Sequence, residues 1–324
     1  MQLNFDPKKN ISKIDYPFIC VNKINDLLIV SKIVKNWYDV LLFRLGIKKK
    51  LTMKLRSGKV KHFNNQKEYF DFWNTVEAQE ELLSAYKAKD LIKIKKNYVE
   101  FKYNGHIVKM SYKNERQLVD ALLLIREQFV EEQYKLLNVK DKIVVDIGAN
   151  IGDSAIYFAL KGAKHVYAFE PYPFAYQTAL ENIKLNNLED KVTIINAACG
   201  GKSGKIGIDE NYESVDGSDL KSFSKGKLID MLTLEDIIKH YNISYNSVLK
   251  IDCEGCEYGI LLNASKETLS LFDQIVLEYH YGYKNLVKKL KELFKVKITA
   301  PRYSLNNEAE NTEMLIGLLI CNRK

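Results

Sequence analysis

The stretch VVDIGANIGDSAIYFALKGAKHVYAFEP, residues 144–171, decides the fold of this 324-residue chain. An apolar run ends at Asp146, a turn follows through Gly148 and Gly152, and an apolar segment leads into a second run that ends at Glu170. This order predicts strand, tight turn, helix and strand. Glycines let the backbone approach a ligand closely, and the N-terminus of the next helix favours polar groups. An acid about 20 residues beyond the glycines suits ribose hydroxyls. We therefore expect an adenosine-containing cofactor at the carboxyl ends of parallel strands.

The residues of the turn favour S-adenosylmethionine over a dinucleotide. The spacing is Gly148-x-Asn150-x-Gly152 rather than GxGxxG, and Asp146 lies two residues before the first glycine. A pyrophosphate needs bare backbone, and a nearby carboxylate repels it. S-adenosylmethionine has no phosphate and carries an ammonium and a sulfonium, so an acid suits it. We predict a methyltransferase; a dehydrogenase and a cofactor-free doubly wound domain are the alternatives.

Six separate blocks of sequence, in a fixed order, resemble the FkbM family of S-adenosylmethionine-dependent methyltransferases. They are VVDIGANIGD (144–153), AFEP (168–171), ALENIKLNN (179–187), NAACG (196–200), KIDCEG (250–255) and VLEYH (276–280). The resemblance covers roughly Glu131 to the C-terminus. It implies a class I, Rossmann-like methyltransferase fold with a last antiparallel strand. It also implies O-methylation, frequently of a hydroxyl on a sugar or other small molecule, and it does not require a metal.

Apolar runs and helical patterns alternate from residue 143 onward, which indicates a parallel sheet. The expected strands are 143–147, 165–170, 191–197, 247–252 and 273–279, with a final pair at 296–300 and 314–321. The expected helices are 152–161, 173–187, 230–241, 256–271 and 283–294. We therefore predict an α/β fold with a doubly wound, mostly parallel, seven-stranded sheet.

The pattern before residue 140 is different and predicts an N-terminal α+β module over 1–139, with the methyltransferase domain over 140–324. Helices are expected at 25–45, 66–89 and 114–137, and hairpins at 50–63 and 98–112. The second hairpin turns at Asn104-Gly105, the pair that a type I′ turn prefers. We expect this module to recognise the acceptor or to cover the active site.

The positive charge of the chain belongs to its first part. Residues 1–140 carry 27 Lys and Arg against 16 Asp and Glu, and the remainder has a net charge of −3. A basic face could meet nucleic acid, anionic lipid or an acidic glycan, although a solvated lysine-rich surface is the ordinary alternative. The helix at 25–45 precedes Lys48, Lys49 and Lys50, so peripheral membrane contact through 25–50 stays open, beside simple packing on its own domain. We find no signal-peptide core and no long apolar run, and expect a cytoplasmic protein.

Nine residues after the first three strands of the sheet are expected to bind the cofactor. From the methionine end to the adenine edge they are Asp146, Gly148, Asn150, Gly152, Ser154, Glu170, Tyr172, Asn196 and Ala197. Glu170 should bind the ribose, and Ser154 should also cap the next helix. For Asn196, an ordinary turn residue is the alternative.

Four residues that end the fourth and fifth strands are the catalytic candidates. Methyl transfer to a hydroxyl needs in-line alignment, exclusion of water and a proton acceptor. Asp252 and Glu254 follow the fourth strand, and Glu278 and His280 end the fifth, so all four should face one crevice. His280 is the first choice of base because its pKa class suits neutral pH, and Glu254 is the second. A structural role for His280 and an Mg²⁺ ion held by this set are alternatives; we predict no metal.

Two further features allow less specific expectations. Cys253 and Cys256 form a CxxC, which we interpret as two small apolar side chains, not a zinc site, a redox dithiol or part of a disulfide framework. The polar segment 200–229 interrupts the alternation and is our substrate-loop candidate, with a surface insertion as the alternative.

An RNA methyltransferase is the competing function. The segment EPYPFAYQTALENIKLNN, residues 170–187, also resembles tRNA methyltransferases of this fold, and the N-terminal part is basic. Base amino methylation commonly uses an NPPY-type tetrapeptide after the fourth strand, where this chain has Asp252-Cys253-Glu254-Gly255. A binding module without activity is disfavoured because every expected cofactor position is filled.

Overall fold

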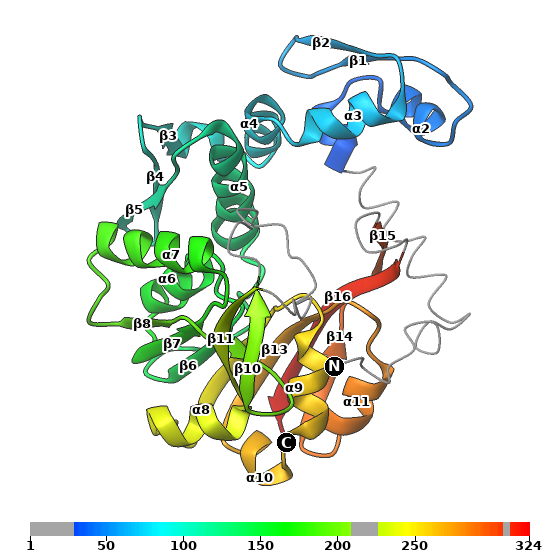
Figure 1. The fold of residues 1–324 in the computed structure, drawn as a ribbon. Coiled ribbons are helices and arrows are strands. Elements are labelled where there is room, and N and C mark those ends of the chain that lie inside the picture. The colour runs from blue at the N-terminus through cyan, green and yellow to red at the C-terminus, as the bar shows by residue number, and fades with distance from the viewer. Residues whose placement is uncertain (1–28, 209–225, 307–311) are drawn as a thin grey trace. The chain divides into compact units, whose positions relative to one another are not determined.

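The computed structural model describes residues 29–208, 226–306 and 312–324 (Figure 1). The chain forms two compact units, one within Cys20–Gln133 and one that contains Tyr134–Lys324. None of the helices in the described ranges combines the length and the hydropathy that crossing a bilayer requires.

A seven-stranded sheet is the centre of the C-terminal unit, as predicted. Its order is β14-β16-β13-β12-β6-β7-β8, and β15 (Arg302–Asn306) pairs with β16 outside this path. The bounds are β6 Ile143–Ile147, β7 His165–Phe169, β8 Val192–Ile195, β12 Ser247–Ile251, β13 Phe272–Tyr279, β14 Phe294–Ile298 and β16 Thr312–Arg323. Strands β13, β12, β6, β7 and β8 are parallel neighbours, and β16 runs antiparallel to β13 and β14. The chain order reverses between β6 and β12, so ligands are expected beyond the carboxyl ends of these two strands.

The helices of this unit follow its strands along the chain. They are α6 Asp153–Leu160, α7 Pro173–Leu185, α8 Leu234–Tyr241, α9 Cys256–Asn263, α10 Lys266–Leu269 and α11 Lys284–Leu290. Alternate residues of the central strands, such as Val145 and Leu249, share a buried cluster with α8, α9 and α11. Helix α6 contacts β6, β7 and β8. Strands β6 and β12 are almost wholly buried, as expected of parallel strands with both faces covered.

A small second sheet replaces part of the predicted polar loop 200–229. Strand β11 (Lys227–Leu232) pairs in parallel with β9 (Ala198–Cys199) and antiparallel with β10 (Gly204–Ile208). The predicted loop was therefore wrong at both ends, because Ile208 and Ile229 are buried together in a small cluster. The helix predicted from 230 begins only at Leu234, because the residues up to Leu232 belong to β11. Residues 209–225 of the substrate-loop candidate lie outside the described residues.

The N-terminal unit is built from short helices and two small antiparallel sheets. Its elements are α2 Trp37–Arg44, β1 Leu51–Lys54, β2 Val60–Phe63, α3 Gln66–Trp73, α4 Val76–Ala85, β3 Ile92–Ile94, β4 Tyr98–Tyr103, β5 His106–Ser111 and α5 Glu115–Ile125. Both predicted hairpins are confirmed as β1–β2 and β4–β5. Asn104 and Gly105 have positive φ angles of 47° and 81°, as a type I′ turn requires.

Each long helix predicted in the N-terminal part is shorter in the structure. The 25–45 prediction is interrupted before α2, because the buried Asn36 side chain bonds with Lys54 N and Thr52 O of β1. The single helix predicted over 66–89 is two helices in the structure, and the Thr75 hydroxyl caps the second by accepting a hydrogen bond from Ala78 N. The 114–137 prediction ends in a π-turn, Arg126–Val130. Residues 25–28 lie outside the described residues.

Candidate active site

The glycine turn after β6 is fixed by close approaches within the protein. A Cβ atom on Gly148, whose φ is +78°, would lie 1.7 Å from the carbonyl oxygen of Asp252. A Cβ atom on Gly152, whose φ is +85°, would lie 3.3 Å from the Cβ of Ala179. Glycine therefore lets the loops after β6 and β12 touch, and lets α6 begin against α7. The backbone N–H of Gly148 also donates to the carbonyl of Phe169, which ties the turn to β7.

Asp146 is fully buried and forms the centre of a charge network. The Nζ of Lys250 lies 2.9 Å from its Oδ1, and the hydroxyl of Ser154 donates to its Oδ2 at 2.6 Å. The same ammonium donates to the carbonyl of Gly148 at 2.6 Å. Burial alone would lower the pKa of Lys250, but the charges of Asp146 and Asp252 raise it above its ordinary value. Lys250 therefore stays protonated and links β12 to the glycine turn.

Lys250 is a functional candidate that the sequence analysis missed, although the sequence contains a signal for it. It is the one charged residue in the strand segment SVLKI, and a lysine in an apolar strand is rarely buried without a partner. The same network corrects the expected role of Ser154. Helix α6 begins after Gly152 with no side-chain cap, and the Ser154 hydroxyl bonds with Asp146 instead. The contact of Asp146 with the methionine end of the cofactor stays a prediction.

Glu170 organises the end of β7. It is 5% exposed, and its carboxylate accepts hydrogen bonds from the backbone N–H groups of Asn150 and Tyr172, both at 2.9 Å. Burial raises the pKa of Glu170 to about 7, against the opposing effect of these two hydrogen bonds. The Asn196 amide donates to the carbonyls of Glu170 and Pro171 at 2.9 and 2.8 Å. The expected ribose and adenine residues thus form one connected structure after β7 and β8.

Two expected adenine-side residues differ in accessibility. Ala197 is 3% exposed and belongs to the main buried cluster. Tyr172 is half-buried and packs against the small cluster of β9, β10 and β11. Of the two, Tyr172 therefore offers the larger surface to a ligand, and its contact with adenine stays a prediction.

His280 lies in a group of carboxylates at the ends of β12 and β13. It is 2% exposed; its Nε2 lies 3.0 Å from Glu254 Oε2 and 4.0 Å from Asp252 Oδ1, and its Nδ1 lies 3.1 Å from Glu257 Oε1. Glu257 is not among the residues predicted from the sequence. It is fully buried and also accepts from the backbone N–H groups of His280 and Gly255, at 3.0 and 2.9 Å. Glu257 therefore fixes both the imidazole and the loop after β12.

The carboxylates change the chemistry that His280 offers. Burial would lower its pKa, but Glu257 and Glu254 outweigh burial and raise the pKa well above its ordinary value. A protonated imidazole donates from both nitrogens and has no lone pair for a substrate proton. Ligand atoms of Asp252, Glu278 and His280 lie within 4.8 Å of one another, a spacing that a divalent cation could also use. The metal-free site remains a prediction.

Asp252 and Glu254 are two members of this group that solvent reaches. The side chain of Asp252 is 26% exposed and that of Glu254 is 31% exposed. The hydroxyl of Tyr134 donates to Asp252 Oδ2 at 3.2 Å. Glu254 has a φ of +52°, a left-handed conformation that costs a non-glycine residue energy and often marks functional sites.

The loop that carries these two acids is closed by a disulfide, which the sequence interpretation did not expect. Cys253 and Cys256 are bonded, with their Cα atoms 5.5 Å apart, a distance usual for such a bond. The interpretation as two unlinked apolar side chains was therefore wrong. Among the described residues, Cys199 and Cys321 are free and buried.

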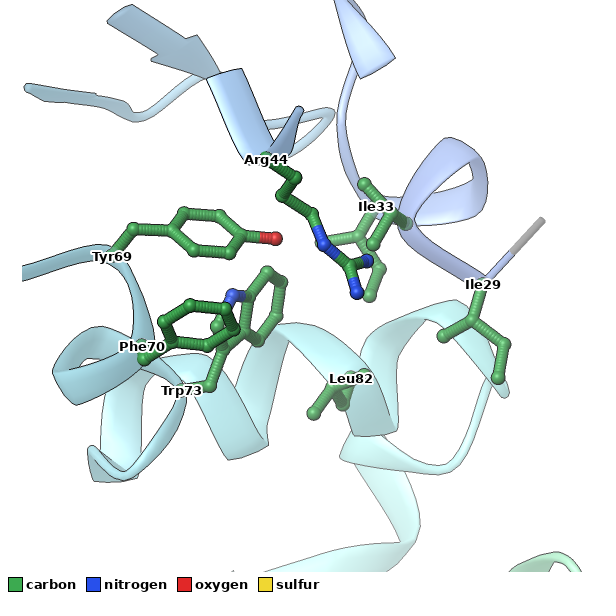
Figure 2. A pocket seen from close by; sticks show the side chains of 8 residues that line it. Ile29, Ile33, Arg44, Tyr69, Phe70, Trp73 and Leu82 are labelled. Atoms are coloured by element: carbon green, nitrogen blue, oxygen red, sulfur yellow. The ribbon is translucent and has the colours of Figure 1, made fainter. Parts of the chain in front are cut away.

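A hollow lies in the N-terminal unit (Figure 2). It has a volume of about 190 Å³ and is lined by Ile29, Val30, Ile33, Arg44, Tyr69, Phe70, Trp73 and Leu82. None of the residues expected to bind the cofactor or to act in catalysis lines it.

The strand order, the glycine turn after β6 and the acids at the strand ends define a class I methyltransferase, the class that uses S-adenosylmethionine as methyl donor. Residues 146–296 match the Methyltransferase FkbM domain. This match over a little under half of the chain confirms the resemblance found in the sequence.

Relatives of this chain include methyltransferases that act on different acceptors. The chain is 23% identical to methyltransferase sdnD of Sordaria araneosa over 49% of this chain and 75% of that protein. It is 24% identical to hexuronic acid methyltransferase AglP of Haloferax volcanii over 47% of this chain and 63% of that protein. A crystal structure of methyltransferase FkbM from Methylobacillus flagellatus is 18% identical, with a TM-score of 0.37, over 57% of this chain and 46% of that chain. Other methyltransferases match over segments that make up 16–22% of their length.

Proposed function

We propose that this protein transfers a methyl group from S-adenosylmethionine to a hydroxyl of a sugar, a glycan or a related small molecule. The observation that carries the proposal is the pair of accessible carboxylates, Asp252 and Glu254, beside the buried cation of His280. Both follow β12, the strand that pairs with β6, and the glycine turn expected to bind the cofactor follows β6. The hexuronic acid named for AglP supports a sugar acceptor.

The residues after β6 and β7 fit an adenosine cofactor. Helix α6 begins at a left-handed glycine without a side-chain cap, so its first amides are not occupied by a capping side chain. Each oxygen of the Glu170 carboxylate accepts one backbone hydrogen bond and keeps a lone pair for a ribose hydroxyl. The bound cofactor supplies an electrophilic methyl carbon on a sulfonium. The chain supplies the orientation and takes up the proton.

Glu254 is the proton acceptor in this proposal. The acceptor oxygen forms a bond to the methyl carbon as the carbon–sulfur bond breaks, and the hydroxyl proton passes to the Glu254 carboxylate. His280, held protonated by Glu257, keeps Glu254 in place. This assignment differs from the sequence-based first choice of His280 as the base, because a protonated imidazole cannot take a second proton.

Calorimetry with S-adenosylhomocysteine tests the cofactor. We expect micromolar binding, roughly −8 kcal/mol. Glu170→Ala should weaken it by about 1.5–3 kcal/mol, since charge-assisted hydrogen bonds are lost. Glu189→Ala, at an exposed acid after α7, is the matched control and should change nothing. Binding of NAD without binding of S-adenosylhomocysteine would show that the cofactor assignment is wrong.

Radiolabelled methyl transfer tests the acceptor and the base together. Oligosaccharides that contain uronic acids should be labelled, and Glu254→Gln should lower kcat by roughly 10²–10⁴-fold with little effect on cofactor affinity. A larger loss for His280→Gln than for Glu254→Gln would return the base to His280. Labelling of tRNA instead of glycans would establish the competing function. Activity lost to a chelator and restored by Mg²⁺ would assign the carboxylates to a metal.

The N-terminal module is proposed to recognise the acceptor or to cover the active site. The methyltransferase unit beginning at Tyr134 contains every residue assigned to the cofactor. A chain of residues 131–324 should therefore bind S-adenosylhomocysteine but lose acceptor turnover. Full turnover by the shortened chain would refute this role.

A further inference from the structure

The N-terminal unit exposes large apolar side chains at α2 and at the turn that follows it. Trp37 and Tyr38 are 40% and 56% exposed, and Leu45 and Ile47 are 63% and 66% exposed. We call these four residues the α2 face. Single exposed apolar residues are ordinary on protein surfaces, but four within eleven residues indicate an interaction surface.

Other side chains of α2 anchor the helix, so the α2 face belongs to a fixed element. Val40 and Phe43 are 0% and 1% exposed and belong to the core of the N-terminal unit. The α2 face is therefore exposed on a helix that the core of the N-terminal unit holds in place.

The turn after α2 presents its side chains on a backbone that is already paired. Gly46 has a φ of +73°, and its N–H donates to the carbonyl of Phe43. The N–H groups of Ile47 and Lys48 both donate to the carbonyl of Leu42. Unpaired amides would oppose entry into an apolar environment, so this pairing removes a cost from inserting Leu45 and Ile47.

Positive charge directly follows the apolar tip. Lys48, Lys49 and Lys50 are all exposed. Asp39, which interrupts the apolar pattern in the sequence, is neutralised in the structure by an ion pair with Lys48 and a hydrogen bond from Asn36. Lys49 and Lys50 therefore add charge that Asp39 does not cancel.

We propose that the α2 face binds an anionic membrane surface. Leu45 and Ile47 enter the boundary between headgroups and acyl chains, Trp37 and Tyr38 lie at the headgroup level, and Lys49 and Lys50 meet lipid phosphates. Aromatic rings with a polar edge prefer this interface, and basic residues are attracted to anionic leaflets. The run of lysines beside the apolar tip favours an anionic bilayer over an apolar protein groove. Binding of this kind is peripheral and does not depend on the methyl-transfer proposal.

Tryptophan fluorescence and vesicle sedimentation test the apolar contribution. The chain contains two tryptophans, so Trp73→Phe leaves Trp37 on the α2 face as the single reporter. Vesicles of phosphatidylcholine with about one third phosphatidylglycerol should shift its emission to the blue and sediment the protein. Leu45→Ser with Ile47→Ser should reduce binding at least about tenfold. The matched control is Leu91→Ser with Leu228→Ser, at residues 55% and 64% exposed, which should bind like the parent.

The charge contribution has its own pair of variants. Lys49→Glu with Lys50→Glu should abolish most binding, as should high salt, whereas Lys95→Glu with Lys96→Glu should have a much smaller effect. All four lysines are exposed. Binding that is equal for neutral vesicles, or unchanged by Leu45→Ser with Ile47→Ser, would overturn the proposal. A dimer in light scattering that Leu45→Ser dissociates, without vesicle binding, would assign the face to a second copy instead.

Discussion

Three helices of the N-terminal unit and two helices of the methyltransferase unit begin in different ways. In the N-terminal unit, α3, α4 and α5 begin with Asn65, Thr75 and Asn114, whose side-chain oxygens each accept a hydrogen bond from a backbone N–H of the first turn. In the methyltransferase unit, α6 and α9 begin at Gly152 and Gly255, which have left-handed conformations and make no side-chain cap.

The difference follows position in the fold, not a general property of the unit. Helices α8 and α10 of the methyltransferase unit have side-chain caps from Thr233 and Ser265. The glycine starts belong to the helices that follow β6 and β12, where the strand order reverses. A capping side chain would occupy amide groups that a ligand can use. At these two starts the helices therefore lack the stabilisation that a side-chain cap gives to α8 and α10 of the same unit.

Charge shows the same contrast. Lys250 of the methyltransferase unit is 2% exposed and paired, whereas Lys49 and Lys50 of the N-terminal unit are exposed. A buried charge depends on its partner, because desolvation makes an unpaired ion costly. An exposed lysine depends little on any partner.

The largest effect should come from removing the buried cation. Lys250→Met leaves Asp146 buried without its counter-ion, so we expect a loss of about 3–5 kcal/mol in the free energy of unfolding. Lys50→Met, at an exposed position, should change it by less than about 0.5 kcal/mol. Urea denaturation of both variants measures the difference. Similar midpoints for the two would break the contrast between buried and exposed charge.

A smaller effect is expected from pH on cofactor binding. Burial raises the pKa of Glu170 to about 7, so the free protein loses this carboxylate charge as the pH falls through that value. The ribose hydroxyls need the ionised acid, and affinity for S-adenosylhomocysteine should fall about tenfold from pH 8 to pH 6. Folding stability should instead increase as the pH falls from about 7 to the ordinary pKa of a glutamate, because the buried carboxylate is then neutral and its charge no longer has to be desolvated.

The variant Glu170→Gln assigns this pH dependence. Burial also raises the pKa of Asp153 to about 7, so two groups titrate in the same window. Calorimetry at several pH values should show a flat affinity for Glu170→Gln. If the affinity of this variant still depends on pH as in the parent, the pH dependence belongs to Asp153.

The smallest effect tests a capped helix. Asn114→Ala removes the hydrogen bond from Gln117 N to the Asn114 side chain, now 3.0 Å long. We expect a loss of about 0.5–2 kcal/mol in stability and no change in S-adenosylhomocysteine affinity. A weaker cofactor interaction in Asn114→Ala would mean that the helix starts of the two units are not independent. Thermal unfolding and calorimetry supply the two measurements.

The sequence by itself determined the sheet and the direction of the site. Strand–helix alternation predicts parallel strands, and the acids Asp146 and Glu170 with the turn glycines lie where such strands end. Both hairpins of the N-terminal unit followed from alternation and turn residues alone. These features depend on neighbours a few residues apart, so local pattern is sufficient to predict them.

Only the tertiary structure decided how the charges of the site are used. Lys250 reaches the carbonyl of Gly148 across 102 residues of sequence, and Glu257 meets His280 across 23. No local pattern says which of two adjacent strands gives a partner to Asp146, or that His280 has carboxylates on both ring nitrogens. The disulfide between Cys253 and Cys256 also depends on the turn that brings them together. Pairing of buried charges is set by strand register and burial, because the partners become neighbours only when the sheet forms.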